Sequence, residues 1–224
     1  MVDVHAPHAP IQGWRDLLVH LGTITMGILI ALFLEGCIEW LQHRQLVHEA
    51  QVSLHREIAH NLQAIKRFTA NIHQRQKELD SDITVLRYLV KNGKMPENKK
   101  VSIDYTISTM DDVSWRTAQA TGAVSYMAYA EAGVYSDIYV SQDALYAAEK
   151  DGARDAILSY APFIGRHDTD SDLTPAQGAD VLQKIQILAG ELKLIESLAA
   201  TLETQYQKYL GAQPPGAGAA TGPG

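Results

Sequence analysis

The sequence predicts an all-α protein in which one N-terminal transmembrane helix continues directly into a long amphipathic helix. Three observations support this fold class: an uncharged apolar run, a seven-residue apolar repeat behind it, and a second heptad pattern near the C-terminus. The two long helices are expected to pack antiparallel as a hairpin, with shorter middle helices filling its open end.

The chain is expected to divide into four parts. Residues 1–16 form a short N-terminal flank, 17–39 the transmembrane helix, and 40–210 a helical extramembrane domain. Residues 211–224, rich in Gly, Pro and Ala, are too polar and too flexible to bury a core and are expected to be a disordered tail.

The apolar run extends from Leu17 to Leu34 without a charged residue and covers about 27 Å at helical rise, enough to cross a bilayer. Trp14 and Trp40 flank the run, and indole rings favour the two headgroup levels of a membrane. Residues 1–10 contain no Lys or Arg, so we expect an uncleaved anchor instead of a secretory signal. A buried core helix is the alternative interpretation.

The segment from Gln42 to Asn92 contains no proline or glycine and predicts one long amphipathic helix. Gly36 is tolerated in a helix at a cost of about 1 kcal/mol, so the span and this helix are expected to be continuous. Asn92-Gly93, followed by Pro96, is typical of a helix end. The apolar seam of this helix repeats every seven residues, at Ile58, Ile65, Ile72, Leu79 and Leu86.

The last helix is predicted to begin at a capping box, with Thr174 at the N-cap, Pro175 in the first turn and Gln177 three residues on. Its apolar seam has the alternating four-and-three spacing of a helix that lies along a partner, and includes Ile185, Leu188, Leu192, Ile195 and Leu202. The long helix before it offers the matching groove. Alternatively, the seam of that first helix could pair with its own copy in a parallel coiled coil.

The middle of the chain predicts shorter elements. Apolar and polar residues alternate over 101–107, which indicates a short strand or an extended segment. Asp111 or Asp112 can cap a helix through Thr121, and a second helix is expected from about Ser125 or Val134 to Tyr160. Four aromatic residues are candidates for a pocket or a partner surface, with core packing as the alternative: Trp115, Tyr135, Tyr139 and Tyr146. Trp115 is expected to plug the open end of the hairpin.

One ridge of the transmembrane helix carries a candidate helix–helix interface. An ionisable side chain such as His20 is costly inside a membrane and normally faces another helix or a polar cavity. Small residues on the same ridge allow close backbone approach, and the ridge consists of His20, Thr23, Gly27, Ala31 and Glu35. As alternatives, His20 bonds within its own helix, reaches toward headgroups, or ligates a haem.

Composition and spacing exclude several classes of function. A formal net charge of -7 argues against a general nucleic-acid binder, and the single cysteine, Cys37, excludes a disulfide within one chain. His55 and His60 stand five residues apart, about 140° around a helix, so the neighbouring histidines lack metalloprotease spacing. A pH-sensing role is the alternative for these histidines. With no phosphate-binding glycine loop and no nucleophile elbow, we expect no catalytic site, no metal and no cofactor.

The motifs around the span carry a resemblance. Trp14-Arg15-Asp16-Leu17-Leu18-Val19-His20, followed by Gly27-Ile28-Leu29-Ile30-Ala31-Leu32 and Glu39-Trp40, resembles small bacterial single-pass membrane proteins of uncharacterised function. That group also has a Trp-centred segment ending in Gly, as in residues 115–122. The resemblance implies an inner-membrane location with the domain in the periplasm. Arginines near the span leave the orientation open, because Arg15 on one side faces Arg44 and Arg56 on the other.

Three hypotheses of function follow. The first is a non-catalytic accessory or scaffold subunit in the lipid bilayer, bound to a membrane-protein partner or to a second copy of itself. The second is a ligand-binding or sensor-like helical bundle that signals through its span and a partner. The third, an enzyme that uses the histidines and a metal, has the least support.

Overall fold

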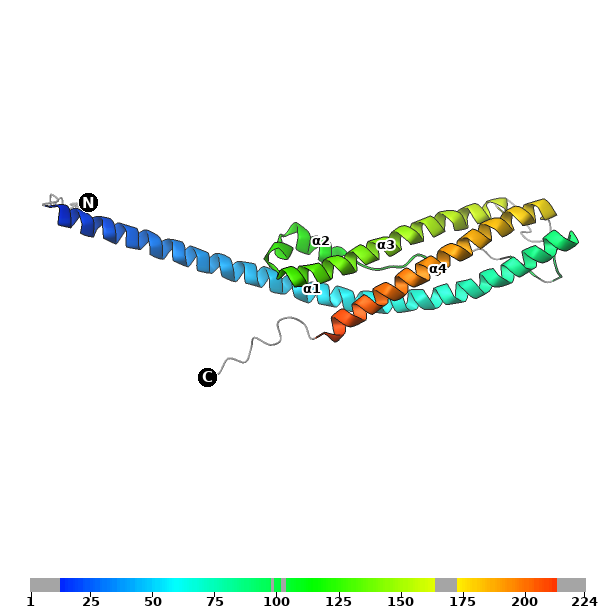
Figure 1. Ribbon diagram of the computed structural model, residues 1–224, viewed down its shortest axis with the longest axis horizontal. Coiled ribbons are helices and arrows are strands. Elements are labelled where there is room, and N and C mark those ends of the chain that lie inside the picture. Colours follow the sequence, from blue (N-terminus) through cyan, green and yellow to red (C-terminus); the bar gives the residue numbers. More distant parts are fainter. Residues whose placement is uncertain (1–12, 98, 102–103, 164–172, 213–224) are drawn as a thin grey trace, which may run out of the picture. The chain divides into compact units, whose positions relative to one another are not determined.

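The computed structural model describes residues 13–97, 99–101, 104–163 and 173–212. Within these ranges the chain is helical and contains no strand, as the sequence predicts. The elements are α1 (Trp14–Asn92), α2 (Val113–Ala120), α3 (Tyr129–Tyr160) and α4 (Pro175–Gly211), with 3-10 turns at Ala123–Tyr126 and Ala161–Phe163 (Figure 1). Most of the expected flank and nearly all of the expected tail lie outside the described residues.

The chain divides into two compact units, Met1–Glu49 and Ala50–Gly224, and the boundary falls within α1. In the first unit, α1 begins at Trp14, and its side chains from Leu17 to Leu41 are all exposed. Mean hydropathy in this part reaches 2.3, and none of it is buried within the chain. By length and composition, this apolar N-terminal stretch could span a membrane.

The second unit is a three-helix bundle formed by the C-terminal part of α1, α3 and α4. α4 runs antiparallel to α1, because Leu89 lies against Gly178 near one end and His55 packs on Tyr209 near the other. Glu196 bonds α1 between these points. The expected antiparallel packing of the two long helices is therefore confirmed.

Both ends of the long helices form as the sequence predicts. The N–H of Gln177 donates to Thr174 Oγ1 at 3.3 Å, and the N–H of Thr174 donates to Gln177 Oε1 at 3.0 Å, which completes the capping box of α4. At the end of α1, Gly93 has a φ of 76° and donates its N–H to Leu89 O. A left-handed residue at this position is the usual way to end a helix, and glycine adopts it without strain.

The two apolar seams form the centre of the core. All ten predicted seam residues are buried, with at most 3% of their surface exposed: Ile58, Ile65, Ile72, Leu79, Leu86, Ile185, Leu188, Leu192, Ile195 and Leu202. The first seam is already buried inside this bundle. A parallel coiled coil between this seam and that of a second copy would therefore require the bundle to open.

The third helix differs from the expectation for the middle elements. α2 lies at the open end of the α1–α4 hairpin, where Trp115 packs on Tyr135 and Tyr139. α3, however, does not stop there: it runs beside α4 along the bundle and buries residues from Tyr135 to Ser159. This buried face extends over most of the helix, so α3 needs neighbours along most of its length.

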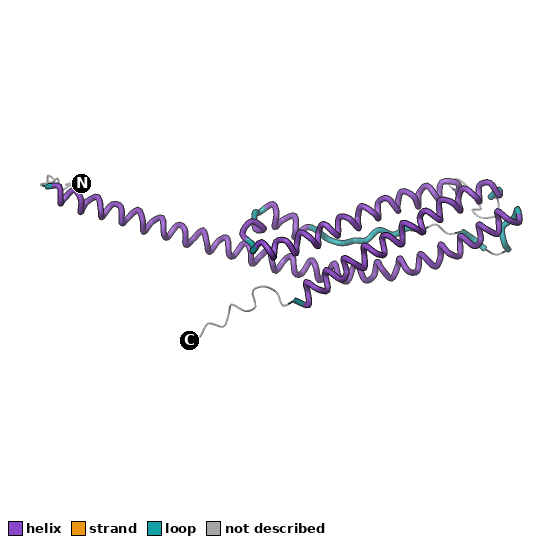
Figure 2. The backbone as a smooth tube through the Cα atoms, in the orientation of Figure 1, coloured by secondary structure: helices purple, strands orange, loops and turns teal. Residues whose placement is uncertain are grey.

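α3 also runs in the same direction as α1, so the chain must first return along the bundle. Residues 104–112, which we call the strap, make the second part of this return as an extended segment without regular secondary structure (Figure 2). The alternation over 101–107 therefore marks an extended segment in its described residues and not a strand. Residues 102 and 103 lie outside the description.

A pair of leucines on α4 tests which face of this helix is buried. Leu188→Ala is expected to lower the free energy of unfolding by about 2–5 kcal/mol, because Leu188 is fully buried and its truncation leaves a cavity. Leu194→Ala is the control: with 57% of its surface exposed, it should change stability by less than about 0.5 kcal/mol. Urea denaturation of the full chain in nanodiscs measures both, and equal losses would contradict this placement of α4.

Candidate functional site

The predicted intramembrane ridge lies on the exposed first part of α1. His20, Gly27, Ala31 and Glu35 are all exposed, as is Thr23, whose hydroxyl donates to Val19 O within its own helix at 2.9 Å. A Cβ added at Gly27 would meet no atom within 4 Å. Nothing in the described part of the chain therefore requires a glycine at this position.

The four predicted aromatic residues do not form one open pocket. Trp115 stacks on Tyr139 with a centroid distance of 5.2 Å, and Tyr135, buried next to them, hydrogen-bonds Tyr209 through its hydroxyl. These three residues are a packed cluster. Tyr146 lies apart from it, half-exposed, beside a shallow cavity of about 300 Å³ that Met110 and Gln142 also line.

Sequence reasoning missed a set of buried polar residues on α1 and α3. We call Glu57, Asn61, Gln142 and Glu149 the polar row; each has less than 9% of its surface exposed. Polar groups buried this deeply must be hydrogen-bonded or they destabilise the fold. Their partners include the strap, the first turn of α2 and tyrosine hydroxyls of α3 and α4.

Glu57 holds the start of α2. Its Oε2 accepts the N–H of Ser114 at 2.7 Å, and its Oε1 accepts the hydroxyl of Tyr139 at 2.5 Å. The N-cap residue of α2, Asp112, makes no side-chain cap of its own. A carboxylate from α1 therefore satisfies an N–H group that this helix leaves open, and its negative charge suits the positive end of the helix dipole.

Asn61 and Gln142 together hold the main chain of Asp111. The amide of Asn61 donates to Asp111 O at 2.7 Å and accepts the Asp111 N–H at 2.9 Å, as a neighbouring strand would. Gln142 adds a second donor to the same carbonyl at 3.0 Å and accepts the Tyr206 hydroxyl at 2.7 Å. At Asp111 the main chain of the strap is thus paired by side chains of α1 and α3.

Glu149 holds the middle of the strap. One carboxylate oxygen accepts both the N–H and the hydroxyl of Ser108, at 3.0 and 2.9 Å, and the Glu149 carbonyl accepts the Tyr105 hydroxyl at 2.8 Å. A Cβ at Gly152 would stand 2.5 Å from that hydroxyl, so only glycine lets the ring approach α3 this closely.

Burial also changes the acid–base chemistry here. Burial raises the pKa of Glu149 above the usual range of a glutamate, and the two hydrogen bonds from Ser108 oppose this only in part. Burial likewise raises the pKa of Glu191 on α4, with a further contribution from the carboxylate of Asp155. The other carboxylate oxygen of Glu149 is buried and has no hydrogen-bond partner within the described residues.

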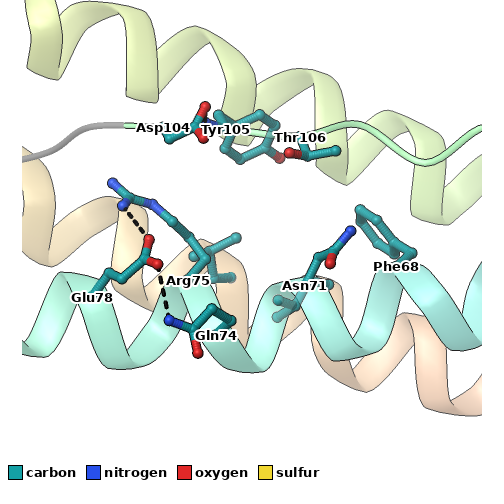
Figure 3. A pocket seen from close by; sticks show the side chains of 10 residues that line it. Phe68, Asn71, Gln74, Arg75, Glu78, Asp104, Tyr105 and Thr106 are labelled. Carbon is teal, nitrogen blue, oxygen red and sulfur yellow. Dashed lines mark hydrogen bonds and ion pairs between the residues drawn. The ribbon is translucent and has the colours of Figure 1, made fainter.

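A cavity of about 260 Å³ opens between α1 and the strap (Figure 3). Its apolar lining residues include Phe68, Ile72 and Leu192. Arg75, with only 8% of its surface exposed, lies on one side of it and bonds Glu78 at 2.9 Å.

Two histidines of α1 contact other parts of the bundle. His60 pairs with Asp111 of the strap at 3.1 Å, and His73 pairs with Glu196 of α4 at 2.6 Å. In the described ranges, no group of three His, Cys, Asp or Glu side chains is placed to hold a metal ion.

One sequence signal could have revealed the polar row. Leu54, Glu57, Asn61, Ala64 and Phe68 follow the same three-and-four spacing as the seams, and all five are buried. Two polar residues within such a stripe indicate that this face of the helix packs against main-chain or side-chain groups that hydrogen-bond them.

Asn61 is expected to be the most sensitive member of the polar row. Asn61→Leu keeps the volume but leaves the N–H of Asp111 unpaired and removes a donor from its carbonyl, so the free energy of unfolding should fall by about 2–4 kcal/mol. Gln63→Leu, an exposed position on the same helix, is the control and should have little effect. Denaturation of the full chain measures both variants, and a neutral Asn61→Leu would contradict the role of Asn61.

Glu149 should make stability depend on pH. The pKa of Glu149 is raised in the folded chain, so protonation of this side chain favours the folded state. This stabilisation is fully present below about pH 4, near the pKa of the unfolded chain, and is lost as pH rises through the pKa of the folded chain. Glu149→Gln removes this titration, so the melting temperature of the wild type should fall relative to the variant from pH 4 toward pH 8. The exposed change Glu97→Gln is the control, and parallel curves for Glu149→Gln and wild type would contradict the prediction.

A scan against protein-family models and searches of curated proteins and of solved structures find no match for this chain. What the protein does must therefore be inferred from its own residues and their geometry.

Proposed function

We propose that this chain is a non-catalytic, membrane-anchored accessory or scaffold subunit that acts through helix–helix contacts in and outside the membrane. One observation carries the proposal: α1 begins as a long apolar stretch with no buried residue and continues, without a break, into a bundle whose apolar seams are already covered. An uncovered apolar surface of this length requires lipid or another protein around it.

The ridge from His20 to Glu35 supports a partner helix as part of that cover. Lipid chains alone do not favour an imidazole in the middle of a span, whereas a second helix can offer it a hydrogen bond. Gly27 leaves an open, flat site on the same ridge, where another backbone can approach closely. The partner is either a different membrane protein or a second copy of this chain.

The proposed location is the bacterial inner membrane, with the bundle in the periplasm. The resemblance of the span and its flanks to small bacterial single-pass proteins supports this, since in that group a single N-terminal span precedes a long helix. With the bundle on that side, any effect on the cytoplasm passes through the span and its partner.

A second candidate function is a ligand-binding or sensor-like bundle that signals through its span and a partner. The observation that favours it is the cavity beside the strap, whose lining includes a buried arginine, two carboxylates and apolar side chains. A ligand there would contact α1, α4 and the strap at once, and could thereby shift their packing.

Two glycines of the span give a matched test of the scaffold proposal. Gly27→Leu and His20→Leu are expected to dissociate the complex, because a bulky side chain blocks close approach and an apolar one removes the hydrogen bond. Gly22→Leu is the control, since Gly22 lies about 140° around the helix from Gly27 and is equally open. Native gels and size measurements in mild detergent report the assembly. An assembly unchanged by both ridge variants would refute the proposal.

A further inference from the structure

The connection between α2 and α3 forms an exposed surface without charge. We call residues 117–130 the uncharged segment, because the chain has no charged residue between Arg116 and Glu131, whereas charged residues make up 20% of the whole sequence. The segment consists largely of small residues and carries two exposed tyrosines, Tyr126 and Tyr129. Tyr129, the first residue of α3, has 97% of its surface exposed. Tyrosine is favoured at surfaces where one end of the side chain is in an apolar environment and the other in water.

The uncharged segment lies at the end of the bundle where α1 enters it. At this end, close to the start of the second unit, Gln51 of α1 donates to Glu131 of α3 at 2.6 Å. Because α3 runs in the same direction as α1, Tyr129 lies nearer to this end of the bundle than Glu131 does. The Cα–Cβ bonds of a helix tilt toward its N-terminus, so the ring of Tyr129 extends toward this end as well.

The length of α1 limits the distance between this surface and the membrane. Trp40 marks the headgroup level of the proposed anchor, and the guanidinium of Arg44 lies 5.4 Å from the centroid of its ring. Gln51 stands eleven positions after Trp40 in the same helix, so their Cα atoms are at most about 17 Å apart, whatever the angle between the two units. The headgroup layer itself covers roughly 5–8 Å of this distance. Headgroups are therefore within reach of the ring of Tyr129.

We propose that the uncharged segment lies in the headgroup layer of the membrane that holds the span, with the ring of Tyr129 inserted among the lipids. An inserted tyrosine removes its ring from water, while its hydroxyl still hydrogen-bonds water or lipid phosphate. Recognition of anionic lipids requires lysine or arginine, and the segment contains neither, so neutral headgroups match it better. The span also tethers the bundle to the bilayer, so this contact forms even when its own affinity is weak.

The inference rests on the anchoring span of the proposed function and not on its partner helix. It is tested with the full chain in phosphatidylcholine nanodiscs in which part of the lipid carries a nitroxide on its headgroup. A bimane fluorophore is attached to one cysteine at a time, either the native Cys37 or, in a Cys37→Ser background, Ala130→Cys or Ala147→Cys. Both alanines are exposed on α3, and Ala147 lies about 26 Å farther along it. Quenching should be at least about twofold stronger at Ala130→Cys than at Ala147→Cys.

The label on Cys37 reports on the anchor separately. Strong quenching at Cys37 and at Ala130→Cys supports both the anchor and the lipid contact. Strong quenching at Cys37, with no more quenching at Ala130→Cys than at Ala147→Cys, would overturn the lipid contact, leave the anchor in place and assign the segment to a protein partner. No quenching at Cys37 would overturn the anchor and this inference together.

A substitution of Tyr129 identifies the side chain that makes the contact. Tyr129→Glu places a charge where the proposal inserts a ring, so it should lower the quenching at Ala130→Cys to the level of Ala147→Cys. Tyr129→Trp keeps an interfacial ring and should retain the quenching. Tyr160→Glu, the same change at an exposed tyrosine at the other end of α3, is the control. Unchanged quenching in Tyr129→Glu would contradict the insertion of this tyrosine, and circular dichroism verifies that each variant is folded.

Discussion

The direction of α3 is the constraint on which the rest of the bundle depends. α3 runs the same way as α1, as the bonds from Gln51 to Glu131 and from Asn61 to Gln142 show, so the chain must return along the bundle before α3 begins. An extended return segment has no helix or sheet hydrogen bonds of its own, and each main-chain N–H or C=O group left unpaired away from water costs about 1–3 kcal/mol. The polar row provides the partners, and without them this topology would be unfavourable.

The polar row and the apolar seams contribute different things to the same bundle. The seams provide burial, but isoleucines and leucines at every seventh position would pack almost as well after a slip of one heptad. Such a slip would separate Glu57 from Ser114 and Asn61 from Asp111, and four buried polar side chains would lose their partners. Burial therefore drives the association of the helices, whereas hydrogen bonding selects their register.

Much of the helical architecture could be predicted from the sequence, because its signals are local. The capping box at Thr174, the glycine after Asn92 and the two seams each depend on residues within a few turns of one another. The direction of α3 could not be predicted, since an amphipathic pattern identifies the buried face but not the orientation of the helix. The strap contacts were missed for a related reason: Asn61 and Asp111 meet only after the chain has turned back, and Tyr105 needs Gly152, far along α3.

In the strap, main-chain groups make the hydrogen bonds that stabilise the fold, whereas several side chains are exposed at the surface. The side chains of Asn61 and Gln142 bond the main-chain N–H and C=O of Asp111, and every residue type except proline has both groups. The side chains of Thr106, Ile107 and Thr109, in contrast, are exposed. Substitutions at these three positions leave those hydrogen bonds in place. The exposed side chains of the strap can therefore change during evolution, and with them the molecules that this surface recognises, without a change in the packing of the helices.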